Sequence, residues 1–304
     1  MKIFIADKRE SFTDNQVSLL QTKGDVTFIE TPEDWKNNQE IYSQEEKILA
    51  LDPNVCEWKL PHELLDRIPN VKAICVPTTR YGWVDPEYIK SKNIILTNVP
   101  KYSSESVAEH AIFQMLSLAK KIAMVSSNNW KLDYDKHLGQ DITGKQMGII
   151  GLGSIGTKIA EFGKGLGMKV CYWSRSSKDK RFEYKELDDL LSTSDYIFVA
   201  VADNSETKNF LSNGMVDEVK KGACIISVTG NVAWDFDYAS EKVKNGDLYG
   251  IAVDDESTYV NSSDLNILVT PHMAWYTKDS VAEDYRIWVE NIISVIAGKI
   301  QNRV

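Results

Sequence analysis

The sequence has few cysteines, no excess of positive charge and no long hydrophobic run. Its 304 residues include four cysteines, none in a CxxC pair, so it predicts neither a disulfide framework nor a cysteine metal site. The formal net charge of −9 disfavours nucleic acid and anionic lipid as partners. No apolar run approaches the roughly 20 residues that span a bilayer, and residues 1–7 have a strand pattern rather than that of a signal peptide. We therefore expect a cytoplasmic protein.

Strand and helix patterns alternate along the chain in two series. Short apolar runs typical of strands lie at 2–6, 25–29, 47–51, 71–76 and 94–97, and again at 146–150, 169–173, 196–200, 223–227, 248–253 and 267–269. This alternation predicts an α/β fold with parallel sheets wrapped by helices, and the length suits two domains. A long helical pattern at 104–123, which Ser103 or Ser104 can cap, joins the two series. An amphipathic helix at 280–297, closed by Gly298, ends the chain and can pack on the first series.

A glycine-rich segment, Gly151-Leu152-Gly153-Ser154-Ile155-Gly156, follows the strand at 146–150 and opens a helical pattern. Glycines at this spacing between a strand and a helix are typical of a dinucleotide-binding loop. Gly151 allows the tight turn, Gly153 lets the backbone approach the pyrophosphate, and Gly156 lets the helix pack closely on the strand. The pyrophosphate then lies beside Ser154 and Ile155, where free N–H groups favour negative charge. The sequence therefore predicts a Rossmann-type domain that binds a dinucleotide cofactor.

The next strand, at 169–173, ends without the acidic residue that bonds the ribose hydroxyls of NAD. The residues that follow it are Ser174, Arg175, Ser176, Ser177 and Lys178. A guanidinium, an ammonium and hydroxyls suit a 2′-phosphate, with Arg175 as the bidentate partner. We therefore expect NADP(H) to be the preferred cofactor, with NAD(H) possible. A solvated basic loop is the alternative interpretation.

Three segments, residues 97–110, 141–156 and 270–272, resemble the signatures of the D-isomer-specific 2-hydroxyacid dehydrogenases, in the family's order. This family holds glyoxylate/hydroxypyruvate reductases and phosphoglycerate dehydrogenases. The resemblance implies two Rossmann-like parallel-sheet domains, with the cofactor domain inserted into a discontinuous substrate domain. On this plan residues 1–100 and 274–304 form the substrate domain, and residues 101–273 form the dinucleotide-binding domain. The resemblance also implies a homodimer built largely through the cofactor domains.

The same resemblance assigns catalytic roles to a histidine, a glutamate and an arginine. In the family the histidine donates a proton to the substrate oxygen, the glutamate raises the pKa of that histidine, and the arginine binds the substrate carboxylate. His272 matches the histidine, whose ordinary pKa of about 6.5 suits proton transfer in either direction. Aligning the segment without a gap places Tyr259 at the position of the family's glutamate, whereas allowing a small deletion places Glu256 there. We prefer Glu256, and Asp255 is a further candidate.

The family's arginine has no match in this sequence. Gly230 occupies its place, and no residue within three positions is basic. The loop after the strand at 71–76 also departs from the family's glycine-rich turn, and it contains Arg80. We predict that Arg80 replaces the missing arginine in binding the substrate. An Arg80 that only forms a surface salt bridge is the alternative, and Lys101 is a second cationic candidate.

Further candidate cofactor contacts follow the later strands of the second series. Asp254 matches the aspartate that lies beside the nicotinamide in the family, and His272 is expected to contact the same ring. Ala202, Val228 and Thr229 are the remaining candidates, each placed just after a predicted strand.

These observations predict an NAD(P)H-dependent oxidoreductase without a metal. It transfers hydride between a nicotinamide cofactor and a 2-keto or 2-hydroxy acid, or a related carbonyl compound, with His272 as the acid and base. Because the arginine is missing, a catalytically weak NADP(H)-binding sensor or regulatory protein is the alternative. Trp234, Trp275 and Tyr276 either shape a pocket for a bulkier substrate or pack at an interface.

Overall fold

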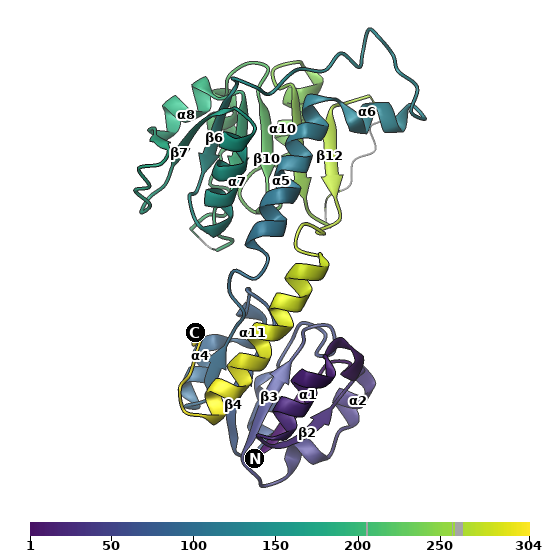
Figure 1. The fold of residues 1–304 in the computed structure, drawn as a ribbon, viewed down its shortest axis with the longest axis vertical. Helices are drawn as coiled ribbons and strands as arrows, with labels where there is room; N and C mark the ends of the chain where they lie inside the picture. Colours follow the sequence, from purple (N-terminus) through teal and green to yellow (C-terminus); the bar gives the residue numbers. More distant parts are fainter. Residues whose placement is uncertain (205, 257, 259–263) are drawn as a thin grey trace. The chain divides into compact units, whose positions relative to one another are not determined.

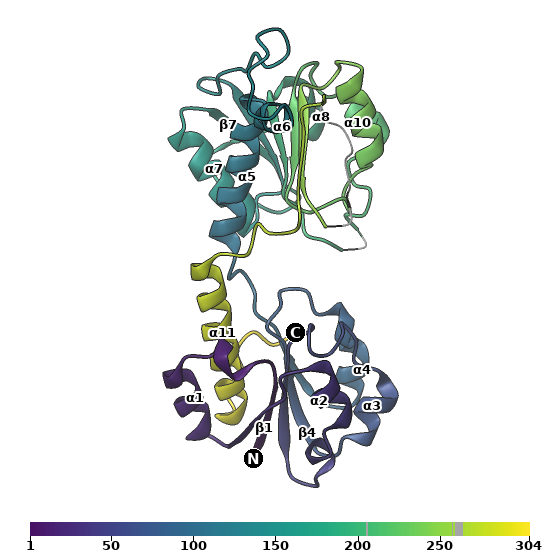
Figure 2. The same cartoon turned by 90° about the vertical axis from the view of Figure 1, so that its right-hand side faces the viewer.

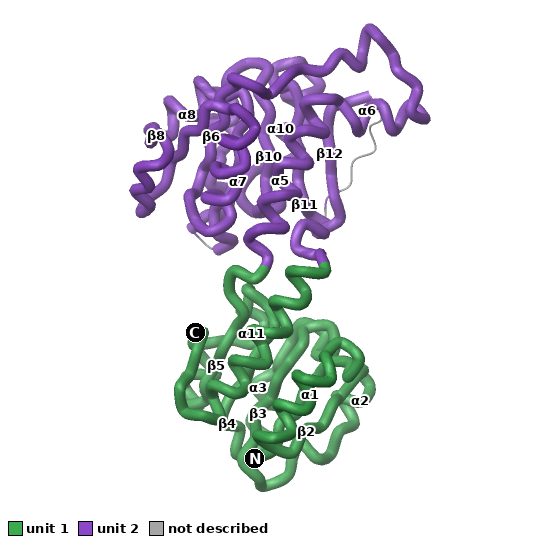
Figure 3. Tube along the Cα trace, viewed as in Figure 1, with its two compact units in different colours: residues 1–102, 278–304 green, residues 103–277 purple. Residues whose placement is uncertain are grey.

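The chain divides into two compact units (Figure 3). Each unit has its own parallel sheet. The computed structural model describes residues 1–204, 206–256, 258 and 264–304. The first unit comprises Met1–Tyr102 together with Lys278–Val304, and the second comprises Ser103–Thr277.

The described residues of the first unit form a five-stranded parallel sheet in the order β2-β1-β3-β4-β5 (Figure 1). Its strands are β1 (Lys2–Ala6), β2 (Asp25–Phe28), β3 (Lys47–Leu51), β4 (Val71–Cys75) and β5 (Ile95–Thr97). Its helices are α1 (Asp14–Gln21), α2 (Pro32–Asn37), α3 (His62–Arg67), α4 (Pro86–Ser91) and α11 (Lys278–Ile296), with 3₁₀ turns at Arg9–Ser11, Glu40–Tyr42 and Gly82–Val84.

Helices cover both faces of this sheet (Figure 2). On one face, α1 and α11 pack against Ile3, Ile5 and other apolar strand residues. On the other face, α2, α3 and α4 pack against the strand residues that alternate with these. The indole N–H of Trp288 donates a hydrogen bond to the carbonyl oxygen of Cys75 at 2.9 Å, which joins α11 to β4. The helix from the end of the chain is thus part of the core formed by its N-terminal residues.

Within the described part of the second unit, seven strands form a parallel sheet in the order β12-β11-β10-β9-β6-β7-β8. They are β6 (Gln146–Ile150), β7 (Lys169–Trp173), β8 (Glu183–Tyr184), β9 (Tyr196–Val199), β10 (Cys224–Ser227), β11 (Gly250–Asp254) and β12 (Ile267–Thr270). The helices are α5 (Ser104–Ala119), α6 (Ile122–Ser127), α7 (Ser154–Gly165), α8 (Leu187–Thr193), α9 (Asn213–Asp217) and α10 (Phe236–Lys244). Helices α5 and α7 cover one face of the sheet, and α8, α9 and α10 cover the other (Figure 1).

The strands predicted from the sequence are confirmed, with ends that shift by one or two residues. The helix predicted at 104–123 is wrong in one respect, because α5 ends at Ala119 and α6 begins at Ile122. Lys121 between them has a φ of 51°, and a left-handed residue cannot continue a right-handed helix. Ser103 is the N-cap of α5 but makes no capping bond through its side chain. The sequence did not predict β8, whose two exposed residues carry no apolar pattern.

The four cysteines are buried and carry free thiols. Burial raises the pKa of Cys75 to about 12, so this thiol is not a nucleophile at neutral pH. None of the helices that the structure describes is long and apolar enough to cross a membrane. The described residues also contain no group of three or more His, Cys, Asp or Glu side chains that could hold a metal ion.

Candidate cofactor and active site

The candidate cofactor residues of the second unit lie at one edge of its sheet. Strands β6, β7, β9, β10, β11 and β12 run parallel, so their carboxyl ends lie at the same edge. Gly151 follows β6, Ser174 follows β7, Val228 follows β10, and His272 lies two residues after the end of β12. In doubly wound sheets ligands bind at this edge where the strand order reverses. Here the order reverses between β6 and β9, next to the phosphate loop.

The three glycines of the phosphate loop have different surroundings. Gly151 has a φ of 97°, and a Cβ there would lie 2.6 Å from the carbonyl oxygen of Ala200, so this position requires glycine. A Cβ on Gly156 would collide with the carbonyl oxygen of Gly151, so α7 packs on the loop without a side chain between them. A Cβ on Gly153 would meet no atom within 4 Å. The side of the loop at Gly153 is therefore open, which leaves room for a ligand such as a pyrophosphate to approach the backbone.

Helix α7 begins directly after Gly153. Its N-cap is Gly153 itself, which has no side chain to accept the N–H groups of the first turn. The N–H groups of Ser154, Ile155 and Gly156 have no acceptor within the helix, because the first turn of any α-helix leaves them unpaired. Ser154 is exposed and Ile155 is half-buried, so this end of the helix is accessible. The loop therefore fits the pyrophosphate of a dinucleotide, which these N–H groups and the helix dipole would hold.

The basic segment after β7 is held by its own hydrogen bonds and ion pairs. The hydroxyl of Ser174 accepts a hydrogen bond from the N–H of Ser177 at 3.1 Å. The guanidinium of Arg175 pairs with Glu206 at 2.8 Å, and the two side chains are 61% and 68% exposed. Ser176 and Lys178 are exposed. Arg175 thus has an acidic partner in this structure, which the sequence prediction did not include.

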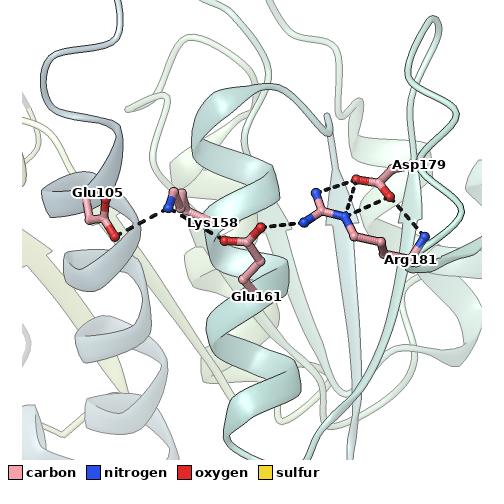
Figure 4. Close-up of polar contacts among 5 residues, drawn as sticks. All are labelled: Glu105, Lys158, Glu161, Asp179 and Arg181. Atoms are coloured by element: carbon pink, nitrogen blue, oxygen red, sulfur yellow. Dashed lines mark hydrogen bonds and ion pairs between the residues drawn. The ribbon is translucent and has the colours of Figure 1, made fainter.

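A second basic side chain in this segment, Arg181, is bound by carboxylates on two sides (Figure 4). Its guanidinium lies 2.6 Å from Asp179 and 2.6 Å from Glu161 of α7. These bonds raise the pKa of Arg181 and lower that of Asp179. Lys158 of α7 extends the chain of ion pairs from Glu161 to Glu105 of α5. The network joins the segment after β7 to the helix of the phosphate loop, so Arg181 serves the scaffold rather than a ligand.

The loops after β9 and β10 are fixed to each other. The hydroxyl of Thr229 donates to the carbonyl oxygen of Val201 at 2.9 Å, and the N–H of Val228 donates to that of Val199 at 3.2 Å. Ala202 is exposed, and its carbonyl oxygen accepts a hydrogen bond from the hydroxyl of Thr207. Hydrogen bonds therefore hold the backbone at Ala202, Val228 and Thr229 at the candidate cofactor edge.

The space beside Gly230 is filled by a carboxylate. Gly230 has a φ of 67°, and a Cβ there would lie 2.6 Å from Oδ2 of Asp255. The same oxygen accepts the N–H of Asn231 at 2.9 Å. The carbonyl oxygen of Gly230 accepts hydrogen bonds from Ser227 at 2.8 Å and from the indole of Trp234 at 3.2 Å. A side chain at this position is therefore disfavoured on two counts, the left-handed backbone and the adjacent carboxylate of Asp255.

His272 is exposed and has a φ of 51°, and its N–H donates to the carbonyl oxygen of Thr270 at 2.9 Å. This turn at the end of β12 directs the chain away from the sheet. Glu256 is exposed and Asp255 is half-buried, both at the end of the neighbouring strand β11. Tyr259, the third candidate for the glutamate's place, lies outside the described residues.

Asp254 has a structural role that the sequence did not reveal. It is buried, and its two carboxylate oxygens accept the N–H groups of Met273 at 3.0 Å and Ala274 at 2.9 Å. Its Oδ1 also accepts the hydroxyl of Thr270 at 2.6 Å. These bonds hold the backbone of Met273 and Ala274, which directly follow His272. Asp254 therefore positions the turn that carries the candidate catalytic histidine.

Two polar residues of α5 complete this network, and the sequence prediction missed their role. Nε2 of His110 lies 2.9 Å from the hydroxyl of Thr270 and 3.7 Å from Oδ1 of Asp254. The amide of Gln114 donates to the same hydroxyl at 3.1 Å. Because that hydroxyl gives its proton to Asp254, Nε2 of His110 must be a donor. Burial lowers the pKa of His110 despite the nearby Asp254, so the ring is neutral. Ser106, His110 and Gln114 recur every four residues and so lie on one face of α5, and this polar spacing is the signal that could have revealed them.

The remaining candidates differ in position. Arg80 lies exposed in the loop after β4 of the first unit, and its carbonyl oxygen accepts the hydroxyl of Thr78 at 2.6 Å. Lys101 is exposed with a φ of 63°. Trp234 is 2% exposed and packs in the core of the second unit. Trp275 and Tyr276 contact each other edge to face, with ring centroids 5.2 Å apart.

Comparison with known proteins agrees with this geometry. The chain is 25% identical to a glyoxylate reductase of Pyrococcus furiosus, over 98% of this chain and 93% of that protein. It is 26% identical to a glycerate dehydrogenase of Methylorubrum extorquens, over 98% of this chain and 99% of that protein. A solved structure described as an acyclic imino acid reductase (Bsp5) in complex with NADPH and D-Arg matches with a TM-score of 0.83 and 24% identity, over 100% of both chains.

Residues 112–274 match the family model described as D-isomer specific 2-hydroxyacid dehydrogenase, NAD binding domain. The matched segment contains the phosphate loop, the basic segment after β7 and the turn of His272. Because the family model spans more than half of the chain, the chain belongs to the D-isomer specific 2-hydroxyacid dehydrogenase family, and it is an oxidoreductase that uses a nicotinamide cofactor.

Proposed function

We propose that this chain is an NADPH-dependent reductase of 2-keto acids in which His272 donates the proton. The family relationship gives the coarser activity, which is hydride transfer between a nicotinamide cofactor and a 2-keto or 2-hydroxy acid. The observation that carries the proposal is that the phosphate loop and His272 lie at the carboxyl edge of the same parallel sheet. A non-catalytic cofactor sensor is not favoured, because the relatives are named as reductases and dehydrogenases.

The proposed chemistry uses few groups of the chain. The bound cofactor supplies the hydride that reduces the carbonyl carbon. As that carbon is reduced, the electron pair of the C=O π bond moves to oxygen, and the imidazolium of His272 gives that oxygen its proton. Glu256, which follows the neighbouring strand β11, bonds to the imidazole and orients it toward the substrate oxygen. Arg80 binds the substrate carboxylate as a bidentate partner.

The preference for NADPH rests on the basic segment after β7. Arg175, Ser176 and Lys178 are exposed and follow the strand next to the phosphate loop, where the adenosine ribose of a dinucleotide lies. A 2′-phosphate placed there forms charge-assisted hydrogen bonds to the guanidinium and ammonium groups. Titration of the protein with NADPH and NADH, followed by protein fluorescence, measures the preference as a ratio of Kd values.

We further propose that the chain is a cytoplasmic homodimer built through its cofactor domain, residues 101–273. Large apolar side chains are exposed on α5, α6 and the segment after them, and a second copy of this chain would cover them. They are Phe113, Leu116, Ile122, Trp130, Leu132, Tyr134 and Leu138. Residues 1–100 and 274–304 form the substrate domain. Light scattering tests the dimer: Leu138→Glu should give a monomer, whereas Leu19→Glu, at an exposed site on α1, should leave the dimer intact.

The experiment that tests the enzymatic proposal follows NADPH absorbance with a panel of 2-keto acids and aldehydes. We expect turnover with at least one 2-keto acid, and loss of that turnover in His272→Ala with NADPH affinity retained. Tight NADPH binding without turnover across a broad panel would refute the proposed function.

A further inference from the structure

The carboxyl edge of the sheet in the first unit carries carboxylates that the proposed reaction does not use. Asp7 directly follows β1, and Asp52 directly follows β3. These two strands are hydrogen-bonded neighbours and run parallel, so the two residues lie side by side at the same edge. Asp7 is 8% exposed and Asp52 is half-buried.

A third carboxylate comes from α11, far along the chain. Asp284 is 8% exposed, and among the described residues its Oδ1 has no hydrogen-bond partner. The next residue, Tyr285, donates its hydroxyl to Oδ2 of Asp7 at 2.6 Å, which brings this turn of α11 against the end of β1. A buried carboxylate oxygen without a partner is costly, so Oδ1 of Asp284 is available to a donor that the described residues do not supply.

The neighbouring polar groups do not neutralise this cluster. Asp7 accepts the N–H of Lys8 at 2.6 Å, and Asp52 accepts the N–H of Asn54 at 2.7 Å. The ammonium of Lys8 is 62% exposed and lies 4.0 Å from Glu10, so it is directed toward water. Burial, together with the charges of Asp52 and Asp7, raises the pKa of Asp284 to about 8, and burial raises that of Asp52 to about 6. The cluster therefore takes up protons where a cation is absent.

The geometry favours an organic cation over a metal ion. The described residues include no group of three carboxylates, histidines or cysteines arranged to hold a metal. A guanidinium or an ammonium has several N–H donors, so one such group can bond to more than one carboxylate. Such a donor would satisfy Oδ1 of Asp284 directly.

We propose that Asp7, Asp52 and Asp284 form a subsite for a guanidinium or ammonium group, and that the substrate is a 2-keto acid whose side chain ends in such a group. This inference rests on the proposed function. The loop that contains Arg80 follows β4, which pairs with β3, so it leaves the same edge of the same sheet. Arg80 and the cluster therefore lie at the same edge of one sheet, and we assign the substrate carboxylate to Arg80 and its cationic group to the cluster.

The subsite can be tested without catalysis, by thermal unfolding with agmatine, a small molecule that carries a guanidinium and an ammonium. We expect agmatine to raise the Tm by about 3–5 °C at about pH 8.5 and by less at about pH 6, because protonated carboxyls do not bind cations. The shift should vanish in Asp284→Asn and in Asp52→Asn. It should persist in Glu63→Gln, which removes one exposed carboxylate elsewhere in the unit. An equal shift with KCl at the same ionic strength would overturn the proposal.

A kinetic comparison tests the substrate class. We expect kcat/KM with NADPH to be at least 10-fold higher for the 2-keto acid of arginine than for that of norleucine, and Asp52→Asn to reduce this ratio about 10-fold. Equal kcat/KM values for the two keto acids would overturn the inference, whatever agmatine does. If no 2-keto acid at all is reduced, the proposed function fails, and the agmatine measurement alone then decides whether the cation subsite exists.

Discussion

The carboxyl edges of the two parallel sheets carry different kinds of groups. In the second unit this edge holds the open glycine of the phosphate loop, the first turn of α7 and the exposed His272. In the first unit it holds Asp7 and Asp52, and Tyr285, the residue after Asp284 on α11, donates a hydrogen bond to Asp7. One edge therefore offers N–H groups to an anion, and the other offers carboxylates to a cation.

The difference shows what a parallel sheet determines and what it leaves open. Parallel strands place all the loops that follow them at one edge, so both sheets bring residues that are distant in sequence to one edge. The chemistry of that edge is set by the first few residues after each strand. Substitutions at these residues can therefore change one edge and leave the other edge, and both cores, intact.

The largest effect is expected at His272. His272→Asn should lower kcat about 100- to 10,000-fold, because the reaction then lacks its proton donor. The Kd for NADPH should change little, since the phosphate loop is untouched. Steady-state kinetics and fluorescence titration measure the two effects separately. His62→Asn, at an exposed histidine of the first unit, is the control. Unchanged kcat in His272→Asn would remove the histidine from the mechanism.

The carboxylates of the first unit should make stability depend on pH. Asp284 has a folded pKa of about 8, above its ordinary value of 3.8, so the folded state holds a proton that the unfolded state releases. The free energy of unfolding should therefore fall as the pH rises from about 4 to about 8. Asp284→Asn should remove part of this fall, on the order of 3 kcal/mol at about pH 9. Denaturant unfolding at several pH values measures it. Parallel curves for the two proteins would contradict the prediction.

Substitution of Gly230 tests whether a side chain there is opposed by backbone strain alone or also by a collision with Asp255. Gly230→Ala should cost about 2–3 kcal/mol of stability, because it adds a left-handed alanine and pushes on the carboxylate of Asp255. Gly222→Ala is the matched control, since Gly222 has a φ of 79° and nothing within 4 Å of its Cβ position. It should cost only about 1 kcal/mol. Equal losses in thermal unfolding would mean that Asp255 moves aside freely.

The features predicted correctly from the sequence are those set by local rules. The phosphate loop follows from glycines between an apolar strand and a helix, and the strands follow from short apolar runs. The same local pattern located the basic segment after β7. It could not show that Arg175 pairs with Glu206, or that Arg181 pairs with Glu161, because those partners lie on other elements.

The features that the sequence did not reveal depend on contacts between distant residues. His110 and Thr270 are 160 positions apart, and Asp7 and Tyr285 are 278 positions apart. Asp254 was expected to contact the cofactor, and only the fold shows that its oxygens bind the backbone after His272. A buried polar residue needs a hydrogen-bond partner, but a single sequence does not identify that partner.

The two sheets should also respond differently to changes in charge. Arg175→Ala should weaken NADPH binding about 10- to 100-fold, because a charge-assisted contact to the 2′-phosphate is lost. The Kd for NADH, which lacks that phosphate, should stay nearly constant and serves as the internal control. Fluorescence titration with both cofactors gives the two values. If the Kd values for NADPH and NADH change equally, the basic segment does not bind the 2′-phosphate.

The smallest effect is expected at Glu206, the acidic partner of Arg175. This carboxylate lies 2.8 Å from the guanidinium of Arg175, so a 2′-phosphate must displace it before binding to Arg175. Exposed ion pairs contribute only about 0.2–1 kcal/mol, so Glu206→Gln should tighten NADPH binding by no more than about 5-fold. The gain should shrink at high salt, because salt already screens the pair. Weaker NADH binding in the same variant would instead mean that Glu206 bonds the ribose hydroxyls. The carboxylate that selects NADH would then follow β9 rather than β7.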